Sequence, residues 1–205
     1  MEFRLTYEGV LLGASKTATR ARHKHEIRKV FHKQLQRLWQ VNPYLRDGHP
    51  IEYKHGMIPF IGMYNSKSTI LEFLADQYVR SGFRFIPLVR ESLSLLCSVN
   101  ILFLRPGVPG SVIGVGGDID NRMKTLFDAL RLPTNTSETG GYGPEEGEDP
   151  FFCLLEDDKL ITHASIETDM LLEPINGSFD VNSTRIVITV KIRPYDVNPG
   201  NMSYG

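Results

Sequence analysis

The arrangement of hydrophobic and polar residues along the chain predicts both strands and helices. Residues 3–7 alternate in polarity and predict a first strand. Apolar residues recur every three or four positions in three segments, which predicts helices over 20–40, 66–80 and 120–130. Runs rich in aromatic, Leu and Val residues predict further strands over 83–89, 93–105, 160–166 and 184–193. The segment 51–64 is ambiguous and is compatible with short strands.

Strands interleaved with helices predict an α/β (α+β) fold, in which a mixed β-sheet is flanked by helices. The chain has 205 residues, enough for one well-packed core without disulfides or structural metals. We expect a single domain over 1–193, with the first strand, a basic helix and an additional helix in 1–82 and the catalytic core in 83–193. Gly, Thr and Glu dominate 133–150, which predicts a flexible acidic insertion, and the composition of 194–205 predicts a disordered tail.

Cysteine content and hydropathy narrow the class of protein. Cys97 and Cys153 lie in apolar runs, so we expect reduced core residues rather than a disulfide. Two cysteines alone do not make a four-ligand zinc site. The first residues lack the pattern of a signal peptide, and the longest apolar run, near 93–104, contains Ser and Asn. These features predict a cytoplasmic protein with no membrane partner.

Charge is distributed unevenly, although the net charge is only −1. Residues 15–37 contain eight Lys or Arg and a single Glu, whereas 138–158 contain eight acids and no Lys or Arg. The basic helix is either an ordinary solvated face or a surface that binds nucleic-acid phosphates. The six side chains placed to contact phosphates are Arg20, Arg22, Lys24, Arg28, Lys29 and Lys33. The histidines expected to face solvent on the same surface are His23, His25 and His32.

The segment 117–130 concentrates carboxylates in an otherwise apolar region. In an extended backbone Asp118 and Asp120 fall on one face, and Mg²⁺ is a cation that offsets such like charges with oxygen ligands. The pattern becomes helical at Asp120, and Lys124 and Asp128 follow at four-residue intervals along one polar edge. A helix that begins with a capping Asp and carries a Lys four residues later is also common as a purely structural feature.

A second acidic cluster favours the functional interpretation. Glu156, Asp157 and Asp158 follow the apolar run 151–155 and precede Leu160 and Ile161. Acids in such a segment are unusual unless a cation or a polar site accounts for them.

The two clusters together resemble the RusA-type Holliday-junction resolvases. The resemblance covers about residues 85–193 and depends on the pattern Asp-x-Asp-Asn-x-x-Lys-x-x-x-Asp-Ala-Leu followed by Asp-Asp-x-x-Ile. It implies that Asp118, Asp120 and Asp158 are the essential carboxylates, and that Lys124 is the motif lysine. It further implies supporting roles for Asn121, Asp128 and Asp157, and a homodimer. The glycines at 114, 116 and 117 and the long insertion depart from the family pattern, which affects substrate choice more than carboxylate chemistry.

We therefore expect a Mg²⁺-dependent endonuclease, with Mn²⁺ as a substitute, that resolves Holliday junctions or other branched DNA in recombination and repair. In this hypothesis Asp118, Asp120 and Asp158 bind the metal, and branched or duplex DNA is the partner. The glycine-rich stretch lacks the signatures of nucleotide-binding loops, so no nucleotide cofactor is expected. The alternatives are a non-catalytic DNA-binding or assembly protein with the same fold, and a metal-dependent phosphohydrolase of small phosphate esters. The second alternative leaves the basic helix unexplained.

Overall fold

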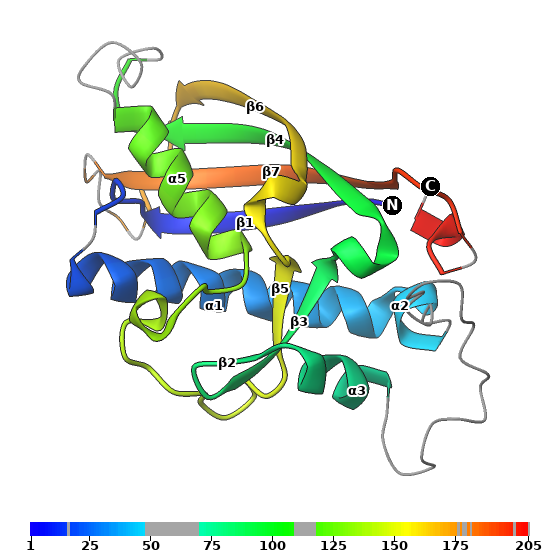
Figure 1. Ribbon diagram of the computed structural model, residues 1–205. Coiled ribbons are helices and arrows are strands. Elements are labelled where there is room, and N and C mark those ends of the chain that lie inside the picture. Colours follow the sequence, from blue (N-terminus) through cyan, green and yellow to red (C-terminus); the bar gives the residue numbers. More distant parts are fainter. Residues whose placement is uncertain are drawn as a thin grey trace.

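Two mixed β-sheets and several helices form the protein, as Figure 1 shows, and they confirm the predicted α/β (α+β) class. The computed structural model describes residues 1–15, 17–47, 70–108, 118–175, 177, 180, 182–198 and 200–204, without the side chains of residues 46, 47, 70, 73 and 118. Its strands are β1 (Glu2–Val10), β2 (Val79–Arg80), β3 (Phe83–Val89), β4 (Leu95–Arg105), β5 (Phe151–Leu155), β6 (Ile161–Met170) and β7 (Ser183–Pro194). Its α-helices are α1 (Ala18–Val41), α2 (Pro43–Asp47), α3 (Ile70–Gln77) and α5 (Asp118–Leu130). The short 3₁₀ helices are η2 (Glu91–Leu93), η3 (Thr136–Thr139), η4 (Asp158–Leu160) and η5 (Met202–Tyr204).

The larger sheet has the strand order β1-β7-β4-β6. β7 pairs antiparallel with both β1 and β4, whereas β4 and β6 are parallel. Buried and more exposed residues alternate along β4 and β7, so one face of this sheet is covered and the other meets solvent. β6 and β1 are the two edge strands of this sheet, and β6 is exposed along most of its length.

The smaller sheet has the order β2-β3-β5, with β5 parallel to β3 and fully buried. β2 and β3 form a hairpin whose turn residues, Ser81 and Gly82, have φ of 55° and 82°. A two-residue hairpin turn of this kind needs positive φ at both positions. The prediction that a helix continues to Arg80 is therefore wrong, because α3 ends at Gln77 and the next residues pair with β3. The predicted start of that helix lies outside the described residues.

Helix α1 is the central element and packs against β1, β5, α5 and η3 (Figure 1). It begins after Thr17, whose side chain accepts a hydrogen bond from the backbone N–H of Arg20 at 3.4 Å. The apolar stripes of α1 and α5 meet the covered face of the larger sheet. Each fully buried apolar side chain there stabilises the folded state by roughly 1.5–3 kcal/mol. The buried side chains at this contact include Leu5, Ile27, Phe31, Leu35, Val99, Ile101, Met123, Leu126, Ile188 and Val190.

The two segments predicted to be flexible or disordered pack against the rest of the protein. In the acidic insertion, Thr139 and Glu148 are only 1% and 7% exposed, because the segment lies on α1 and its acids meet basic side chains there. In the tail, Tyr204 is buried, and its ring packs edge-on against Tyr44 at 5.3 Å. The carbonyl of Tyr204 also accepts a hydrogen bond from the amino terminus of Met1. Each segment is thus in contact with residues far away in the sequence.

Three smaller expectations can also be compared with the structure. Cys97 and Cys153 are free, buried thiols, as predicted. Among the helices in the described part of the chain, none combines the length and apolarity needed to cross a bilayer. The ambiguous segment 51–64 and the glycines at 114–117 lie outside the described residues.

Candidate active site

Helix α5 carries the first acidic motif and begins at Asp118, two residues earlier than predicted. Asp118 and Asp120 are thus both helical, and residues two apart on a helix lie about 200° apart around its axis. The expectation that this pair shares one face of an extended segment is therefore wrong. Asp120 is exposed in the first turn, where the helix dipole favours a carboxylate.

Lys124 and Asp128 follow Asp120 on the polar edge of α5 but have different surroundings. Lys124 is exposed, whereas Asp128 is only 8% exposed. Asp128 Oδ2 accepts a hydrogen bond from Lys24 Nζ, and Oδ1 accepts one from Arg131 Nη2, both at 2.8 Å. This carboxylate thus joins α1 to the end of α5.

Arg28 lies beneath this ion pair and binds the end of α5 through backbone carbonyls. It is 1% exposed, and it donates to the carbonyls of Asp128 at 2.8 Å, Arg131 at 3.3 Å and Glu138 at 3.3 Å. A cation at a helix C-terminus satisfies the last carbonyls and complements the helix dipole. Burial lowers the pKa of this guanidinium. The expectation that Arg28 contacts phosphates is therefore corrected, because its side chain is enclosed by these elements.

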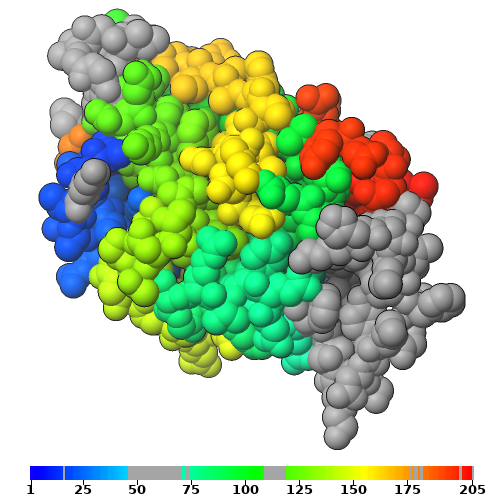
Figure 2. Space-filling model, in the orientation of Figure 1, coloured from blue at the N-terminus to red at the C-terminus, as the bar shows by residue number. Residues whose placement is uncertain are grey.

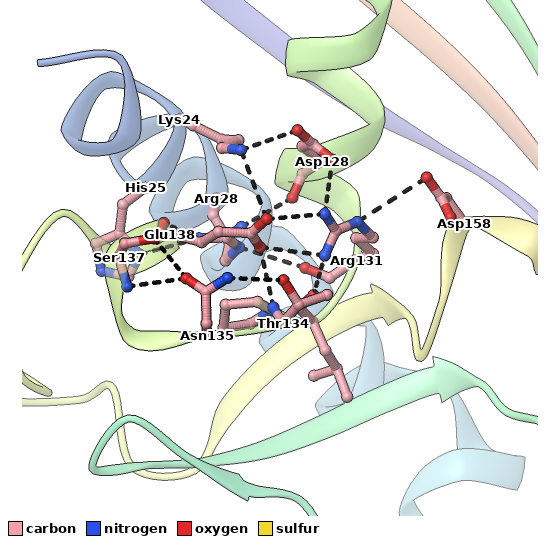
Figure 3. Close-up of polar contacts among 12 residues, drawn as sticks. Lys24, His25, Arg28, Asp128, Arg131, Thr134, Asn135, Ser137, Glu138 and Asp158 are labelled. Atoms are coloured by element: carbon pink, nitrogen blue, oxygen red, sulfur yellow. Dashed lines mark hydrogen bonds and ion pairs between the residues drawn. The ribbon is translucent and has the colours of Figure 1, made fainter. Parts of the chain in front are cut away.

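Arg131 and Glu138 form the centre of the polar network in Figure 3. Arg131 Nη1 donates to Glu138 Oε2 at 3.1 Å and to the carbonyl of Leu132 at 2.8 Å, and Nη2 donates to Glu138 Oε1 at 3.0 Å. Burial acts to lower the pKa of Arg131, but the hydrogen bonds and charges of Glu138 and Asp128 outweigh burial and raise it. Burial acts to raise the pKa of Glu138, but the hydrogen bonds from Arg131 and the Thr134 N–H outweigh burial and lower this pKa below its ordinary value. Both side chains are therefore charged at neutral pH.

The second acidic motif follows the carboxyl end of β5, where η4 begins. Asp157 Oδ1 accepts a hydrogen bond from the Lys159 N–H at 3.0 Å and so caps η4, which gives this supporting residue a structural role. Asp158 is exposed, and its Oδ2 lies 4.0 Å from Arg131 Nε (Figure 3). The motif thus offers one exposed carboxylate close to the network around Arg131.

The two motifs lie on neighbouring elements, because α5 packs against η4. Asp158 lies beside Arg131, just after the last turn of α5, whereas Asp120 lies in its first turn. Asp120 and Arg131 are eleven positions apart along the helix axis, which corresponds to about 16 Å of rise. Within the described residues no group of three His, Cys, Asp or Glu side chains is arranged to hold a metal ion. The Asp118 side chain is outside that description.

A cleft of about 1050 Å³ opens between the N-terminal part of α1, the polar edge of α5 and η3. Figure 2 shows these segments side by side on one face, with α1 in blue and α5 and the insertion in light green. Five of the predicted site residues line it, together with Arg131 and Glu138. These are Arg20, Lys24 and Lys124, and the predicted supporting residues Asn121 and Asp128. The cleft therefore brings the basic helix together with Asn121, Lys124 and Asp128 of the first motif, whereas Asp120 and Asp158 are not among its described lining residues.

The acidic insertion covers part of the basic face of α1. Lys29 Nζ lies 2.8 Å from Glu145 Oε1 and 3.3 Å from Glu148 Oε1. Lys24 is paired with Asp128, as described above, and lies 4.0 Å from Glu138 Oε1. Of the six basic residues predicted to contact phosphates, Arg22 and Lys33 are exposed, Arg20 is partly exposed, and the other three are engaged within the protein. Arg22 Nε also donates a hydrogen bond to the carbonyl of Gly140 at 3.3 Å.

The histidines of α1 are not the solvent-facing group that the sequence predicted. His25 and His32 are 0% and 2% exposed, and His23 is partly buried. His32 Nδ1 accepts a hydrogen bond from the Phe152 N–H at 2.9 Å, so its Nε2 donates to the carbonyl of Gly147 at 3.1 Å. His32 thereby attaches both β5 and the insertion to α1.

Sequence reasoning missed Arg131 and Glu138. Arg131 follows Asp128 by three residues, a spacing that favours an ion pair on a helix, so its local role was detectable. Glu138 gave no comparable signal, because its position depends on how the insertion folds back. Comparisons of the chain with protein-family models, curated proteins and solved structures found no match in any of the three. The residues of the site and their geometry therefore carry the functional inference.

Proposed function

We propose that the protein is a Mg²⁺-dependent endonuclease that hydrolyses phosphodiesters in branched DNA, in the manner of the RusA-type junction resolvases. The observation that carries this proposal is the cleft, which joins the polar edge of α5 to the basic N-terminal part of α1. Cations beside a carboxylate motif suit a polyanionic substrate that is cut with the help of a metal.

The donor set suits Mg²⁺, although the described residues hold no ready-made group of three ligands. Mg²⁺ binds through one or two carboxylates, keeps several waters and takes substrate phosphates as further ligands. Asp120 and Asp158 are exposed carboxylates of this kind, and Asp118 begins the same helix as Asp120. Because Asp120 lies in the first turn of α5 and Asp158 beside Arg131, just after its last turn, the two would not share an ion. Asp120, with Asp118, and Asp158 would each hold a Mg²⁺ ion of its own. When bound, it supplies an activated water and neutralises charge that develops on the phosphate.

Lys124 contributes to the same chemistry in this proposal. It is exposed one turn after Asp120 and lines the cleft, where its ammonium faces any phosphate that enters. A positioned cation of this type stabilises the charge of the transition state. Arg20, on the opposite wall, would bind a neighbouring phosphate of the same strand.

A homodimer belongs to the same proposal. Two equivalent sites related by symmetry suit a junction in which two strands are cut. The exposed edge strand β6 supports this idea, because an unpaired strand edge presents backbone groups that a second copy can pair with.

A second candidate is a metal-dependent phosphohydrolase of small phosphate esters. The cleft volume of about 1050 Å³ favours it, since it lies near the upper end of the range for small-molecule sites. The non-catalytic alternative, a DNA-binding or assembly protein, differs from both in having no hydrolytic activity.

The decisive experiment incubates the protein with a labelled four-way junction, a linear duplex and a small activated phosphodiester, each with and without Mg²⁺. We expect Mg²⁺-dependent cleavage of the junction, and loss of that cleavage in Asp120→Asn with little change in folding, because Asp120 is exposed. Asp196→Asn, an exposed Asp in the C-terminal segment, is the matched control. Cleavage of the small ester alone would support the second candidate. Near wild-type cleavage by Asp120→Asn would refute the assigned site.

A further inference from the structure

Arg122 lies inside the first acidic motif but on the opposite side of α5 from the exposed residues of that motif. It is two positions after Asp120 and two before Lys124, and residues two apart on a helix lie about 200° apart around its axis. Asp120 and Lys124 are exposed, whereas Arg122 is only 5% exposed. An Arg side chain is almost never buried without polar partners, so the partners of this guanidinium indicate what it does.

The guanidinium of Arg122 joins α5 to the ends of two strands. Its Nη1 donates a hydrogen bond to the carbonyl of Leu11, and its Nη2 donates to Asn182 Oδ1 at 3.0 Å. Leu11 directly follows β1 and Asn182 directly precedes β7, and the Leu11 N–H donates to the Asn182 carbonyl at 3.0 Å. Arg122 therefore attaches α5 to the point where these two strands meet.

A backbone contact lies one residue earlier in α5. The Ala14 N–H donates to the Asn121 carbonyl at 2.9 Å, so the segment that follows β1 also binds the first turn of the helix. The first N–H groups of a helix have no partner within the helix, and helix ends fray. The start of α5 is thus held to the rest of the protein by one buried side chain and one backbone hydrogen bond.

This attachment matters because the exposed residues of the motif have no side-chain partners of their own. Within the described part of the chain, the Asp120 and Lys124 side chains form no hydrogen bond or ion pair. Their positions therefore depend on the backbone of the first turns of α5. A site of this kind is oriented only as well as the structure that supports it.

We propose that Arg122 is a positioning residue for the first acidic motif, which fixes the start of α5 through Leu11 and Asn182 and so orients Asp120 toward a divalent cation. The inference rests on the proposed function for the role of Asp120. It adds to that function a residue that touches neither the metal nor the substrate. Residues that orient metal ligands in this way typically contribute roughly 10- to 100-fold to metal affinity.

The test measures the binding of Mn²⁺, as a probe of the Mg²⁺ site, to the protein without DNA, so that cleavage is not needed. Free Mn²⁺ gives an electron paramagnetic resonance signal that is lost on binding. Arg122→Met, which keeps the length of the side chain and removes its donors, is made in two backgrounds. Asp158→Asn leaves the first motif as the assigned site, and Asp118→Asn/Asp120→Asn leaves Asp158.

We expect Arg122→Met to weaken Mn²⁺ binding about tenfold in the Asp158→Asn background. In the other background the affinity should stay within about twofold, because Asp158 follows β5 and does not depend on the start of α5. A purely structural role of Arg122 would lower both affinities together, or neither of them.

Hydrogen exchange shows where the structure changes. In Arg122→Met the backbone amides of 122–125, in the first turns of α5, should exchange faster than in the parent protein. The amides of 126–130 should exchange at the parent rate. Asn182→Ala removes one of the two acceptors and should give a smaller effect of the same kind, so it tests the proposal even if Arg122→Met does not fold.

Tyr44→Phe is the matched control. Its hydroxyl donates to the carbonyl of Gly200 at 3.1 Å, so the variant loses a partly buried hydrogen bond elsewhere in the protein. It should leave both Mn²⁺ affinities and the exchange of α5 unchanged.

Two results would overturn the inference. These are an unchanged Mn²⁺ affinity of the first motif in Arg122→Met and Asn182→Ala, and an equal loss in the two backgrounds. A parent Asp158→Asn protein that binds no Mn²⁺ would overturn both this inference and the assigned metal site. Failure of the proposed function alone looks different, because Mn²⁺ binding would depend on Arg122 as expected while junction DNA would not be cleaved with Mg²⁺.

Discussion

His25 illustrates how packing changes the chemistry of a single residue. Its ring is fully buried, stacks on Tyr142 at 5.6 Å and meets the edge of Phe83 at 5.5 Å. Burial, assisted by the positive charges of Arg28 and Lys29, lowers its pKa to about 4. The imidazole is therefore neutral at neutral pH, and its role is that of a polar aromatic side chain in the core.

Stability should consequently fall in mildly acidic solution. An unfolded chain protonates His25 near pH 6.5, whereas the folded protein does so only near pH 4. Keeping His25 neutral therefore contributes up to about 3 kcal/mol to the free energy of unfolding. This contribution is complete above about pH 6.5 and is lost as the pH falls toward 4. Urea unfolding of His25→Gln between pH 7.5 and 4.5 should show a weaker pH dependence than the wild type. His163→Gln, on the exposed strand β6, is the control. Parallel curves for wild type and His25→Gln would contradict the assignment.

Glu138 controls the surroundings of Asp158 through Arg131. The Nη hydrogens of Arg131 are taken by Glu138, Asp128 and a carbonyl, which leaves only Nε, 4.0 Å from Asp158 Oδ2. In Glu138→Gln we expect Arg131 to pair with Asp158 and compete with a bound cation. The Mg²⁺ concentration needed for half-maximal cleavage should rise about tenfold, and the unfolding free energy should fall by about 2 kcal/mol. Glu146→Gln, exposed in the same segment, should change neither quantity. A stability loss with an unchanged Mg²⁺ requirement would make Glu138 purely structural.

At the level of elements, α1 organises the site because it contacts α5, β5 and the insertion at once. Arg28 is central to this arrangement, since it donates to carbonyls of Asp128, Arg131 and Glu138. The end of α5 and the start of the insertion are thus held to one buried cation. Their relative positions, and therefore the shape of the cleft, depend on this side chain.

Arg28→Gln should be strongly destabilising. Glutamine is too short to reach the same carbonyls, so buried acceptors would lose their partners, at a cost of about 3–5 kcal/mol. Urea denaturation should show this loss, and Arg37→Gln on the exposed face of the same helix should cost less than about 0.5 kcal/mol. A comparable small loss in both variants would show that α1 is held mainly by its apolar stripe.

The same elements show what the sequence can and cannot predict. The helices α1 and α5 and the strand β7 were predicted within about two residues of their ends, because local periodicity determines them. The end of α3 was not predicted correctly, because the hairpin turn at Ser81 and Gly82 determines the backbone there in spite of the helical periodicity. The acidic motifs were recognisable as candidate site residues, but the roles of Arg131 and Glu138 depend on contacts between segments distant in the chain. The burial of His25 and His32 has the same origin.

At the scale of the whole molecule, the charge asymmetry of the sequence is largely neutralised by folding. The acidic insertion pairs with the middle of the basic helix, through Lys29 with Glu145 and Glu148. On the described part of α1, exposed positive charge remains on either side of this contact, at Arg22, Lys33 and Arg37. Duplex arms of a substrate are therefore expected to contact a smaller part of α1 than its composition suggests.

The dependence of DNA binding on salt tests this division of α1. Each duplex phosphate contact contributes about 0.9 to the slope of log affinity against log salt. Replacing the exposed pair, as Arg22→Gln/Lys33→Gln, should flatten the slope for a junction with duplex arms by up to about 1.8. Replacing the internally paired residues, as Lys24→Gln/Lys29→Gln, should leave the slope nearly unchanged, because their charges are already compensated by acids at 2.8 Å. The reverse pattern would mean that the insertion leaves α1 when DNA binds, so that its acids and the phosphates compete for the same lysines.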